Sequence, residues 1–412
     1  MLKKKIAVIG SGAAGCFCAV NIMENAPECE VFMFEASASM MTKLSFTGGG
    51  RCNITNTFEA FDDFKKIYPR GYNLMRALFF EFNNNDVFSW FSKHNLELYA
   101  QDDGRVFPVS NNAFQVVETL KKYMLKYGVK IFLKHCLTAV SCKDEKFLLT
   151  FNGNETFSQL FDSVIITTGG GNSPKFFEMF QRLGIEIISP APSLFSFKIK
   201  SNLLTALQGQ TKENCSLMLA GQKFHSRGGI LITHFGFSGP AVLTLSSYAS
   251  RFFFQNNYKG DLVVNWVDKT QDETINLLNG IIKKYPQKNV CALHLDGFSS
   301  KLWEFLLTRA EIPLNRKYSE LGKKTINKLV LTLTSDVYHI SGRGQSGGEF
   351  VTSGGVDLKS VNKKNLEAKT VKNLFFAGEV LDIDAITGGY NLQAAWTTAK
   401  IVSDNFLSSN NA

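Results

Sequence analysis

Three consecutive glycines precede an arginine and a cysteine in the stretch SFTGGGRCNITN, residues 45–56. Such a stretch could cradle a phosphate, present a nucleophilic thiol, or line a flat cofactor. A phosphate-binding P-loop carries Lys and then Ser or Thr directly after its last glycine, to reach the terminal phosphates and a magnesium ion. Arg51 and Cys52 occupy those two positions here. The stretch is therefore not a P-loop, and the other two interpretations depend on the rest of the chain.

A second glycine pattern, GSGAAG at residues 10–15, follows a short apolar run and precedes a helix-like segment. The next apolar run ends at Glu35, twenty residues after Gly15. This order is typical of a dinucleotide site: Gly10 permits the tight turn, Gly12 lets the backbone approach a pyrophosphate, and Gly15 lets helix and strand pack closely. The helix N-terminus would face the phosphates with free N–H groups, and Glu35 would accept hydrogen bonds from ribose hydroxyls.

Two further glycine-rich segments follow apolar runs, TTGGG at residues 167–171 and AGEV at residues 377–380. FAD is longer than one β-α-β unit can hold, so its flavin must be reached by elements from elsewhere in the sheet. These strand ends therefore favour FAD over NAD. Glu379 could accept hydrogen bonds from the ribityl hydroxyls, or it could simply cap a turn.

Gly388 and Gly389 begin a helical pattern that continues through Tyr390 and Asn391. A reduced flavin carries negative charge around N1 and the C2 carbonyl. A helix N-terminus aimed at that region would stabilise the anion through its dipole and its free amides. The alternative is ordinary capping of a helix by glycine.

The opening stretch lies between the strand that ends at Glu35 and a helical segment, where many FAD enzymes pass the chain under the flavin. Its glycines would let the backbone approach a planar ring. Arg51 could pair with a phosphate or carboxylate and Asn53 could donate a hydrogen bond, whereas Cys52 lacks a partner cysteine and is expected to be a packing residue. The predicted cofactor-binding residues are Gly10, Gly12, Ala13, Ala14, Gly15, Glu35, Ala36, Lys43, Gly49, Gly50, Arg51, Cys52, Asn53, Thr168, Gly169, Gly170, Gly378, Glu379, Gly388, Gly389, Tyr390 and Asn391.

Composition limits the classes of protein. The 45 basic and 36 acidic residues give a net charge of +9, but they are intermixed and no basic run exceeds residues 3–5, so no nucleic-acid partner is expected. Eight cysteines without a C-x-x-C pair and six scattered histidines predict no metal site.

The N-terminus has the outline of a signal peptide, yet glycines interrupt its apolar stretch. No segment approaches the roughly 20 apolar residues that span a bilayer, so we expect a cytoplasmic protein and no membrane partner.

Near residue 190 the sequence changes to the alternation of apolar and polar residues that is typical of antiparallel strands. Near residue 343 the apolar runs followed by glycines, as in the N-terminal part of the chain, return. The predicted fold class is α/β, a Rossmann-type FAD-binding domain on a parallel sheet, built from both termini and interrupted by an inserted domain. The predicted domains are residues 1–190 with 343–412 for FAD, and residues 191–342 for the insertion, β-rich over 191–270 and helical over 271–328.

Three local predictions complete this organisation. Residues 103–113 are predicted as a turn-rich loop, and KLVLTLTSDVYHI, residues 328–340, as a strand. A second G-x-G-x-x-G at residues 342–347 precedes a strand-like run and no helix, so we interpret it as a hinge loop and not as a nucleotide site.

Candidate catalytic residues come from THFGFSGP, residues 233–240, which follows a strand-like run and is expected to form part of the substrate-site wall between the inserted domain and the flavin. Pro240 suits the first turn of a following helix, and Ser238 would cap it. His234 could deliver a proton as hydride reaches the substrate; the alternative is a buried histidine satisfied by backbone. Tyr390 is the rival proton donor.

The chain resembles the BaiN-like (YhiN-like) family of bacterial NAD(P)/FAD-dependent oxidoreductases over nearly its whole length. The resemblance implies an FAD-binding domain interrupted by an insertion and a role as reductase or oxidase, with one branch linked to reduction of steroid-type enones. Ala368 stands before Lys369 where the family pattern suggests Ser. The motifs that carry the resemblance are IGSGAAG, TKLSFTGGGRCNITN, GRVFPVS, TTGGG, GGILITHFGFSGPAVLTLS, VTSGGV and GEVLDIDAITGGYNLQAAW.

The predicted function is an FAD-dependent oxidoreductase that transfers a hydride between flavin and a small, largely apolar substrate, such as an enone-type double bond. NAD(P)H is the expected electron donor. Two alternatives stay open: a flavin-containing RNA-modifying protein, which the pI of about 9.0 permits, and a non-catalytic flavin sensor. The sequence leaves the substrate, the direction of reaction and the oligomeric state open.

Overall fold

The computed structural model describes residues 3–59, 63–153, 155–344 and 351–407. The chain divides into two compact units, one formed by residues 1–191 with 351–412 and the other by residues 192–350. The predicted domain division remains a proposal, because compactness alone does not show that a unit folds independently.

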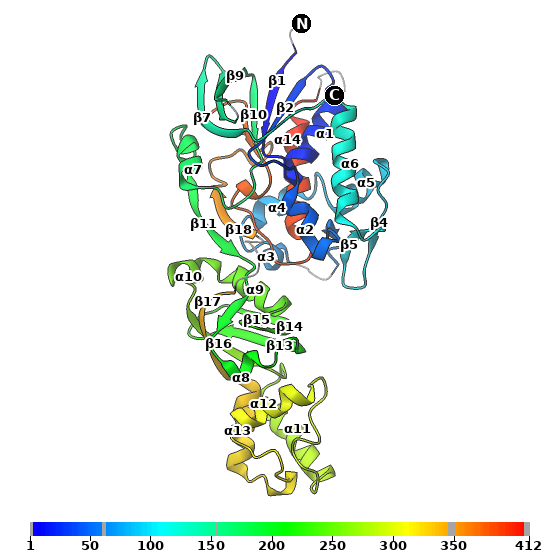
Figure 1. Ribbon diagram of the computed structural model, residues 1–412, viewed down its shortest axis with the longest axis vertical. Coiled ribbons are helices and arrows are strands. Elements are labelled where there is room, and N and C mark those ends of the chain that lie inside the picture. Colours follow the sequence, from blue (N-terminus) through cyan, green and yellow to red (C-terminus); the bar gives the residue numbers. More distant parts are fainter. Residues whose placement is uncertain (1–2, 60–62, 154, 345–350, 408–412) are drawn as a thin grey trace. The chain divides into compact units, whose positions relative to one another are not determined.

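The first unit combines a five-stranded parallel sheet, two three-stranded antiparallel sheets, a two-stranded sheet of β11 and β18, and several helices (Figure 1). Its elements, with β11 crossing into the second unit, are β1 (Lys5–Ile9), α1 (Ala13–Asn25), β2 (Glu30–Glu35), α2 (Thr42–Gly50), β3 (Thr55–Asn56), α3 (Phe64–Ile67), α4 (Tyr72–Leu78), α5 (Asn84–Lys93), β4 (Leu98–Ala100), β5 (Arg105–Pro108), α6 (Ala113–Lys126), β6 (Lys130–Leu133), β7 (Cys136–Lys143), β8 (Lys146–Asn152), β9 (Phe157–Phe161), β10 (Ser163–Ile166), α7 (Pro174–Gln181), β11 (Ile187–Ser193), β18 (Val351–Val356), β19 (Leu374–Phe376), η2 (Gly378–Val380) and α14 (Tyr390–Asp404).

The parallel sheet has the strand order β19-β10-β1-β2-β6. Strands β19, β10, β1 and β2 are almost continuously buried, whereas the edge strand β6 contains no fully buried residue. Strands buried on both faces lack the polar alternation of a half-exposed sheet. The rings of Phe34 on β2 and Phe151 on β8 stack at 3.9 Å, so the β7-β8-β9 sheet covers one face. Helices α1 and α14 lie side by side in Figure 1, and the rings of Phe17 and Trp396 are 5.2 Å apart. The Rossmann-type fold predicted from the sequence is confirmed, with its sheet built from both ends of the chain.

The second unit is a closed six-stranded barrel, in the order β12-β15-β14-β13-β16-β17, accompanied by helices α11, α12 and α13. Its elements are β12 (Phe197–Ile199), α8 (Asn202–Thr205), β13 (Thr211–Leu219), β14 (His225–Thr233), β15 (Gly236–Ser238), α9 (Pro240–Tyr248), α10 (Ser250–Gln255), β16 (Gly260–Asn265), α11 (Gln271–Lys284), α12 (Ser300–Arg309), η1 (Tyr318–Glu320), α13 (Lys323–Thr334) and β17 (Asp336–Arg343).

Two local predictions are wrong. Residues 328–334 belong to helix α13, and only Asp336–Arg343 form a strand. Leu329, Val330 and Leu333 are buried at helical spacing, so the apolar run packs as one face of a helix although its composition also suits a strand. The segment predicted as a loop contains strand β5 at Arg105–Pro108, which pairs with β3 and β4.

The described residues contain neither a membrane-spanning helix nor a metal-binding group of side chains. Within them, no helix combines the length and apolar character needed to cross a membrane. The described part of the chain also contains no group of three or more His, Cys, Asp or Glu side chains able to hold a metal ion. The second glycine pattern is described only in part: Gly342 and Arg343 end β17, while residues 345–347 lie outside the described residues.

Candidate functional site

The turn between β1 and α1 gives each glycine of GSGAAG a separate task. Gly10 has φ +102°, and a side chain there would place its Cβ 2.6 Å from the Thr167 carbonyl oxygen. A Cβ on Gly15 would lie 2.0 Å from the Gly10 carbonyl oxygen, so this glycine is required for close packing of helix on strand. A Cβ on Gly12 would meet no atom within 4 Å. Helix α1 starts at this open position without a side-chain cap, which leaves its first N–H groups available to an anion.

Glu35 ends β2 beside this turn. Its carboxylate accepts hydrogen bonds from the backbone N–H and hydroxyl of Ser11, at 2.9 and 2.8 Å, and from the same two groups of Ser37, at 2.8 and 2.7 Å. Burial raises the pKa of the Glu35 carboxyl, but these hydrogen bonds outweigh it and the net pKa lies below the ordinary value. Glu35 is therefore an ionised acceptor at neutral pH.

The glycine-rich stretch begins in the C-terminal part of helix α2, where the backbone is kinked. Thr47, Gly48 and Gly49 have non-helical backbone angles inside the assigned helix, and a Cβ on Gly49 would meet no atom within 4 Å. The Arg51 guanidinium lies over the Phe107 ring, 4.3 Å from its centroid. Cys52 is fully buried with φ +60°, and burial raises the pKa of its thiol to about 12. A thiol that stays protonated at neutral pH is a weak nucleophile, in line with the packing role predicted for Cys52.

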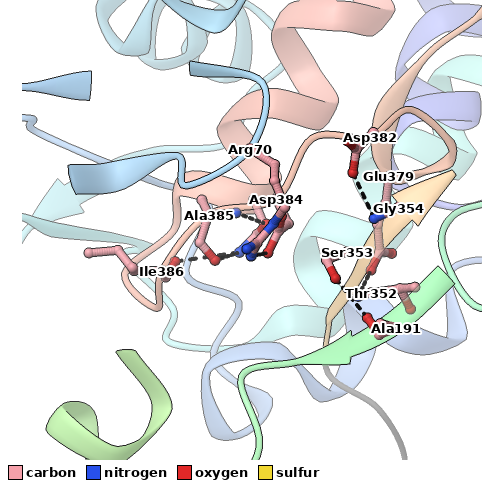
Figure 2. A network of polar contacts seen from close by, with 11 residues as sticks. Arg70, Ala191, Thr352, Ser353, Gly354, Glu379, Asp382, Asp384, Ala385 and Ile386 are labelled. Carbon is pink, nitrogen blue, oxygen red and sulfur yellow. Dashed lines mark hydrogen bonds and ion pairs between the residues drawn. The ribbon is translucent and has the colours of Figure 1, made fainter. Parts of the chain in front are cut away.

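Glu379 in η2 connects three segments that are distant in sequence, and Figure 2 shows it beside one of them, the segment of Thr352. Its carboxylate accepts the backbone N–H of Gly170 at 3.1 Å and of Thr352 at 2.8 Å, and it lies 3.7 Å from Lys43 Nζ. Glu379 does not cap its own turn, since η2 has no side-chain cap, and its predicted bond to ribityl hydroxyls stays a prediction. The hydroxyl of Thr352 beside it is buried and has no hydrogen-bond partner among the described residues. An unpaired buried hydroxyl next to a carboxylate fits a site that accepts a polar ligand.

Helix α14 begins at Tyr390 after Gly389, whose φ is +94° and which supplies no side-chain cap. The Asn391 side chain is committed to the chain itself, because it bonds the backbone N–H of Ala385 at 2.9 Å and the carbonyl of Ala385 at 3.0 Å. Only the backbone amide of Asn391 remains for a ligand. Tyr390 is buried, and burial, with a smaller effect of Asp103, raises the pKa of its phenol. It is a protonated group at neutral pH.

Sequence reasoning missed the bracing of the loop between η2 and α14 (Figure 2). Arg70 forms a two-pronged ion pair with Asp384, whose side chain is fully buried. Asp382 accepts the backbone N–H of Gly354 at 2.8 Å. The GEVLDIDAITGGYN motif contains both aspartates, but no sequence spacing identifies Arg70, more than three hundred residues away, as the partner.

The predicted cofactor-binding residues all lie in the first unit. Direct contacts join most of their segments. A Cβ on Gly378 would lie 2.8 Å from the Ala14 methyl group, and a Cβ on Gly389 would lie 2.8 Å from Asn53 Oδ1. Together with the bonds of Glu379, these contacts connect the GSGAAG helix, the glycine-rich stretch, the TTGGG strand end and the start of α14. Two uncapped helix N-termini, open glycines and the orphaned Thr352 hydroxyl fit a long dinucleotide such as FAD.

His234, unlike the predicted cofactor-binding residues, belongs to the second unit. It occupies the turn between β14 and β15, on the wall of a cavity of about 440 Å³. The side chain is exposed, so the alternative of a buried histidine is wrong. Ser238 does not cap α9: Gly239 holds that position, and Ser238 Oγ instead pairs with Ser196 Oγ at 2.8 Å. Pro240 begins the helix as predicted.

The parallel sheet, the glycine turn and the acidic end of β2 define a Rossmann-type FAD-dependent oxidoreductase. Within that class, the chain belongs to the family described as "HI0933-like protein Rossmann domain", whose model matches residues 4–405. The predicted resemblance to the BaiN-like family is confirmed.

Three comparisons give the range of similarity. The "ribosomal RNA dihydrouridine synthase" of Haemophilus influenzae is 30% identical over 408 residues, covering 95% of this chain and 96% of that protein. The "3-dehydro-bile acid delta(4,6)-reductase" of Clostridium scindens is 26% identical over 404 residues, covering 96% and 97%. A solved 3-ketosteroid-delta4-(5alpha)-dehydrogenase from Rhodococcus jostii RHA1 covers 99% of this chain and 98% of its own, with a TM-score of 0.53 at 12% identity, which supports the fold.

Proposed function

We propose that this chain is a reductase of a carbon–carbon double bond conjugated to a carbonyl, and that its substrate is a uracil base of ribosomal RNA. The observation that carries the proposal is the 30% identity, over 95% of the chain, to a protein named for dihydrouridine synthesis in ribosomal RNA. Dihydrouridine is uridine whose C5–C6 double bond has gained two hydrogens. This proposal prefers the RNA-modifying alternative to the expectation that no nucleic acid is a partner.

Both relatives' names describe the same type of chemistry on different molecules. A dihydrouridine synthase and a delta(4,6)-reductase each add hydrogen to a double bond, and in a conjugated system hydride enters at the carbon β to the carbonyl while a proton enters at the α carbon. The reaction type therefore rests on two relatives, whereas the RNA substrate rests on one of these two names.

The residues of the first unit suit such a reaction. FAD, when bound and reduced by a donor such as NAD(P)H, would supply the hydride. Gly12 leaves room for its pyrophosphate, ionised Glu35 can accept ribose hydroxyls, and the free amides at the start of α14 favour negative charge. Tyr390, whose pKa is raised by burial, keeps its proton at neutral pH and can donate it from Oη to the substrate carbon.

A second candidate is reduction of a small apolar enone. The cavity that contains His234 favours it, because Leu231, Ile232, Phe235 and Leu243 give that cavity a largely apolar lining. A proton donor at its wall would then be His234 in place of Tyr390. His234→Ala and Tyr390→Phe separate the two, provided that flavin reduction and substrate turnover are measured independently. Parent rates of turnover in both variants would exclude both residues as the acid.

The experiment is an anaerobic reduction followed by two substrate arms. NADH and NADPH, the proposed donors, are first compared for bleaching of the flavin absorbance. The reduced protein is then given an unmodified ribosomal RNA transcript or a steroid-type enone, and dihydrouridine is detected as a mass gain of two hydrogens on uridine. Failure of fully reduced protein to form dihydrouridine contradicts the RNA proposal, and enone reduction in that case supports the second candidate.

A further inference from the structure

The positive charge of the chain is concentrated in one unit. Residues 192–350 contain 19 Lys and Arg against 11 Asp and Glu, a net charge of +8. The remaining residues contain 26 basic and 25 acidic side chains, a net charge of +1. Nearly the whole net charge of +9 therefore belongs to the second unit, although no long basic run reveals it in the sequence.

Within that unit, three short segments bring basic residues together where α11 ends and α13 begins. Backbone hydrogen bonds join the first two: the N–H of Tyr318 donates to the Lys288 carbonyl at 3.0 Å, and that of Val290 donates to the Arg316 carbonyl at 2.8 Å. The third segment, at the start of α13, follows the second directly along the chain. We call the cluster the basic tip; it consists of Lys283, Lys284, Lys288, Arg316, Lys317, Lys323 and Lys324.

The basic tip is not neutralised by neighbouring acids. Among the described residues, none of its seven side chains forms an ion pair with a carboxylate, and Glu320 is the single acidic residue of residues 283–290 and 313–324. Lys317 instead bonds the Gln287 amide oxygen at 3.0 Å. Lys323 and Lys324 occupy the first turn of α13, which contains no acidic residue, although the helix dipole disfavours cations there. Folding therefore does not explain these charges.

The aromatic ring of Tyr285 and a cavity lie next to the basic tip. Tyr285 is 37% exposed, and Lys284 Nζ lies 5.2 Å from its ring centroid. Both residues line a cavity of about 890 Å³ under α11. Lys212, only 6% exposed, lines the same cavity together with Lys269, Glu273 and Asp296. The Lys212 Nζ donates to the Glu213 carbonyl at 2.6 Å. Lysines that contact phosphates beside a ring on which a base can stack are the usual components of a single-stranded nucleic-acid site.

We propose that the basic tip and the adjoining cavity bind a single-stranded segment of RNA, with the lysines on its phosphates and Tyr285 under one base. The site holds the RNA and takes no part in the chemistry. The choice of RNA as ligand rests on the proposed function, whereas the location rests on the charge and geometry of the second unit.

The test compares binding of a short single-stranded uridine-containing RNA by the flavin-loaded protein and two double variants. Lys323→Glu with Lys324→Glu changes the basic tip, and Lys363→Glu with Lys364→Glu makes the same change of net charge on exposed lysines of the first unit. We expect the tip variant to bind roughly tenfold more weakly. The slope of its log K against log salt should fall by about 1 for each phosphate that the variant no longer binds. Tyr285→Ala should weaken binding with little change of slope.

Weaker RNA binding by the variant with Lys323→Glu and Lys324→Glu would not result from misfolding, because acidic residues in the first turn of α13 favour the helix. The Tm of the tip variant should equal or exceed that of the parent, with the same flavin absorbance. Equal weakening by the Lys363 and Lys364 variant, or unchanged RNA binding by the tip variant, overturns the proposal. Loss of binding to anionic lipid vesicles with RNA binding retained would also overturn it, in favour of a membrane surface.

The outcomes also separate this inference from the proposed function. Tip-dependent RNA binding by a reduced protein that forms no dihydrouridine would leave the RNA site standing and contradict the proposed reaction. Dihydrouridine formation by the tip variant, at the parent's KM for RNA, would leave the reaction standing and contradict the site.

Discussion

Gly12 and Gly15 belong to one motif, yet a side chain at each position meets a different surrounding. At Gly12 the φ of −78° suits any residue and nothing in the chain obstructs a Cβ, so only a ligand would be displaced. At Gly15 a Cβ would strike the Gly10 backbone. The first glycine is therefore required for binding and the second for folding.

We predict that Gly12→Val purifies folded but without FAD, whereas Gly15→Ala loses about 1–3 kcal/mol or more of unfolding free energy through overpacking. Flavin absorbance after purification measures the first effect. Urea unfolding of flavin-free samples measures the second, with flavin-free parent protein as control. A yellow Gly12→Val protein would contradict the pyrophosphate position.

The pKa of Glu35 predicts how FAD retention depends on pH. Because its folded-state pKa lies below the ordinary value, the ionised form is the favoured one, and its contribution to stability is present above about pH 4.5 and lost as pH falls through the lowered pKa. We expect FAD release on acidification to begin below pH 4.5 in the parent. Glu35→Gln should hold FAD more weakly at neutral pH and lack this acid-dependent step, measured by flavin fluorescence after filtration. An identical acid profile in the variant would assign the step to another group.

At the scale of elements, the loop between η2 and α14 is fixed by polar contacts in place of regular structure. Arg70 and Asp384 form its central pair, with 14% and 0% of their side chains exposed. Removing one partner of a buried pair leaves a charge without compensation, which typically costs about 3–5 kcal/mol.

We therefore predict that Arg70→Leu lowers the unfolding free energy by about 3–5 kcal/mol, while Arg70→Leu with Asp384→Leu recovers much of the loss because no unpaired charge remains. Denaturant unfolding of the two variants and the parent tests this. A double variant no more stable than the single one would show that the pair matters through its other contacts.

The elements around the FAD site could be predicted because their local patterns carry the information. The glycine motif, the buried apolar runs and Glu35 predict β1, α1 and β2 directly. Closure of β12 to β17 into a barrel could not be predicted, since alternating burial specifies strands but not their partners. In the same way, Arg70 and Thr352 join the site through contacts between distant segments, which composition and spacing do not encode.

At the scale of the whole molecule, all the predicted cofactor residues lie in one unit and most of the net charge in the other. A ligand stabilises the native state of the part that it contacts. We predict that adding FAD to flavin-free protein slows amide hydrogen exchange in α1, α2, η2 and the start of α14, and changes residues 192–344 little. Protection of the barrel comparable with that of α1 would contradict a flavin site confined to the first unit.

The strands on either side of the insertion pair with each other: β11 with β18 in one sheet, and β12 with β17 in the barrel. This pairing has a consequence for synthesis on the ribosome. The barrel and its helices are complete once residue 343 has emerged, whereas the parallel sheet still lacks its edge strand β19 and its covering helix α14. Since domains fold largely as units during translation, we expect the barrel to fold on the nascent chain while the first unit waits for residues 351–404, which contain β18, β19 and α14. Cofactor capture would then report that helix α14, which ends at Asp404, has left the ribosome.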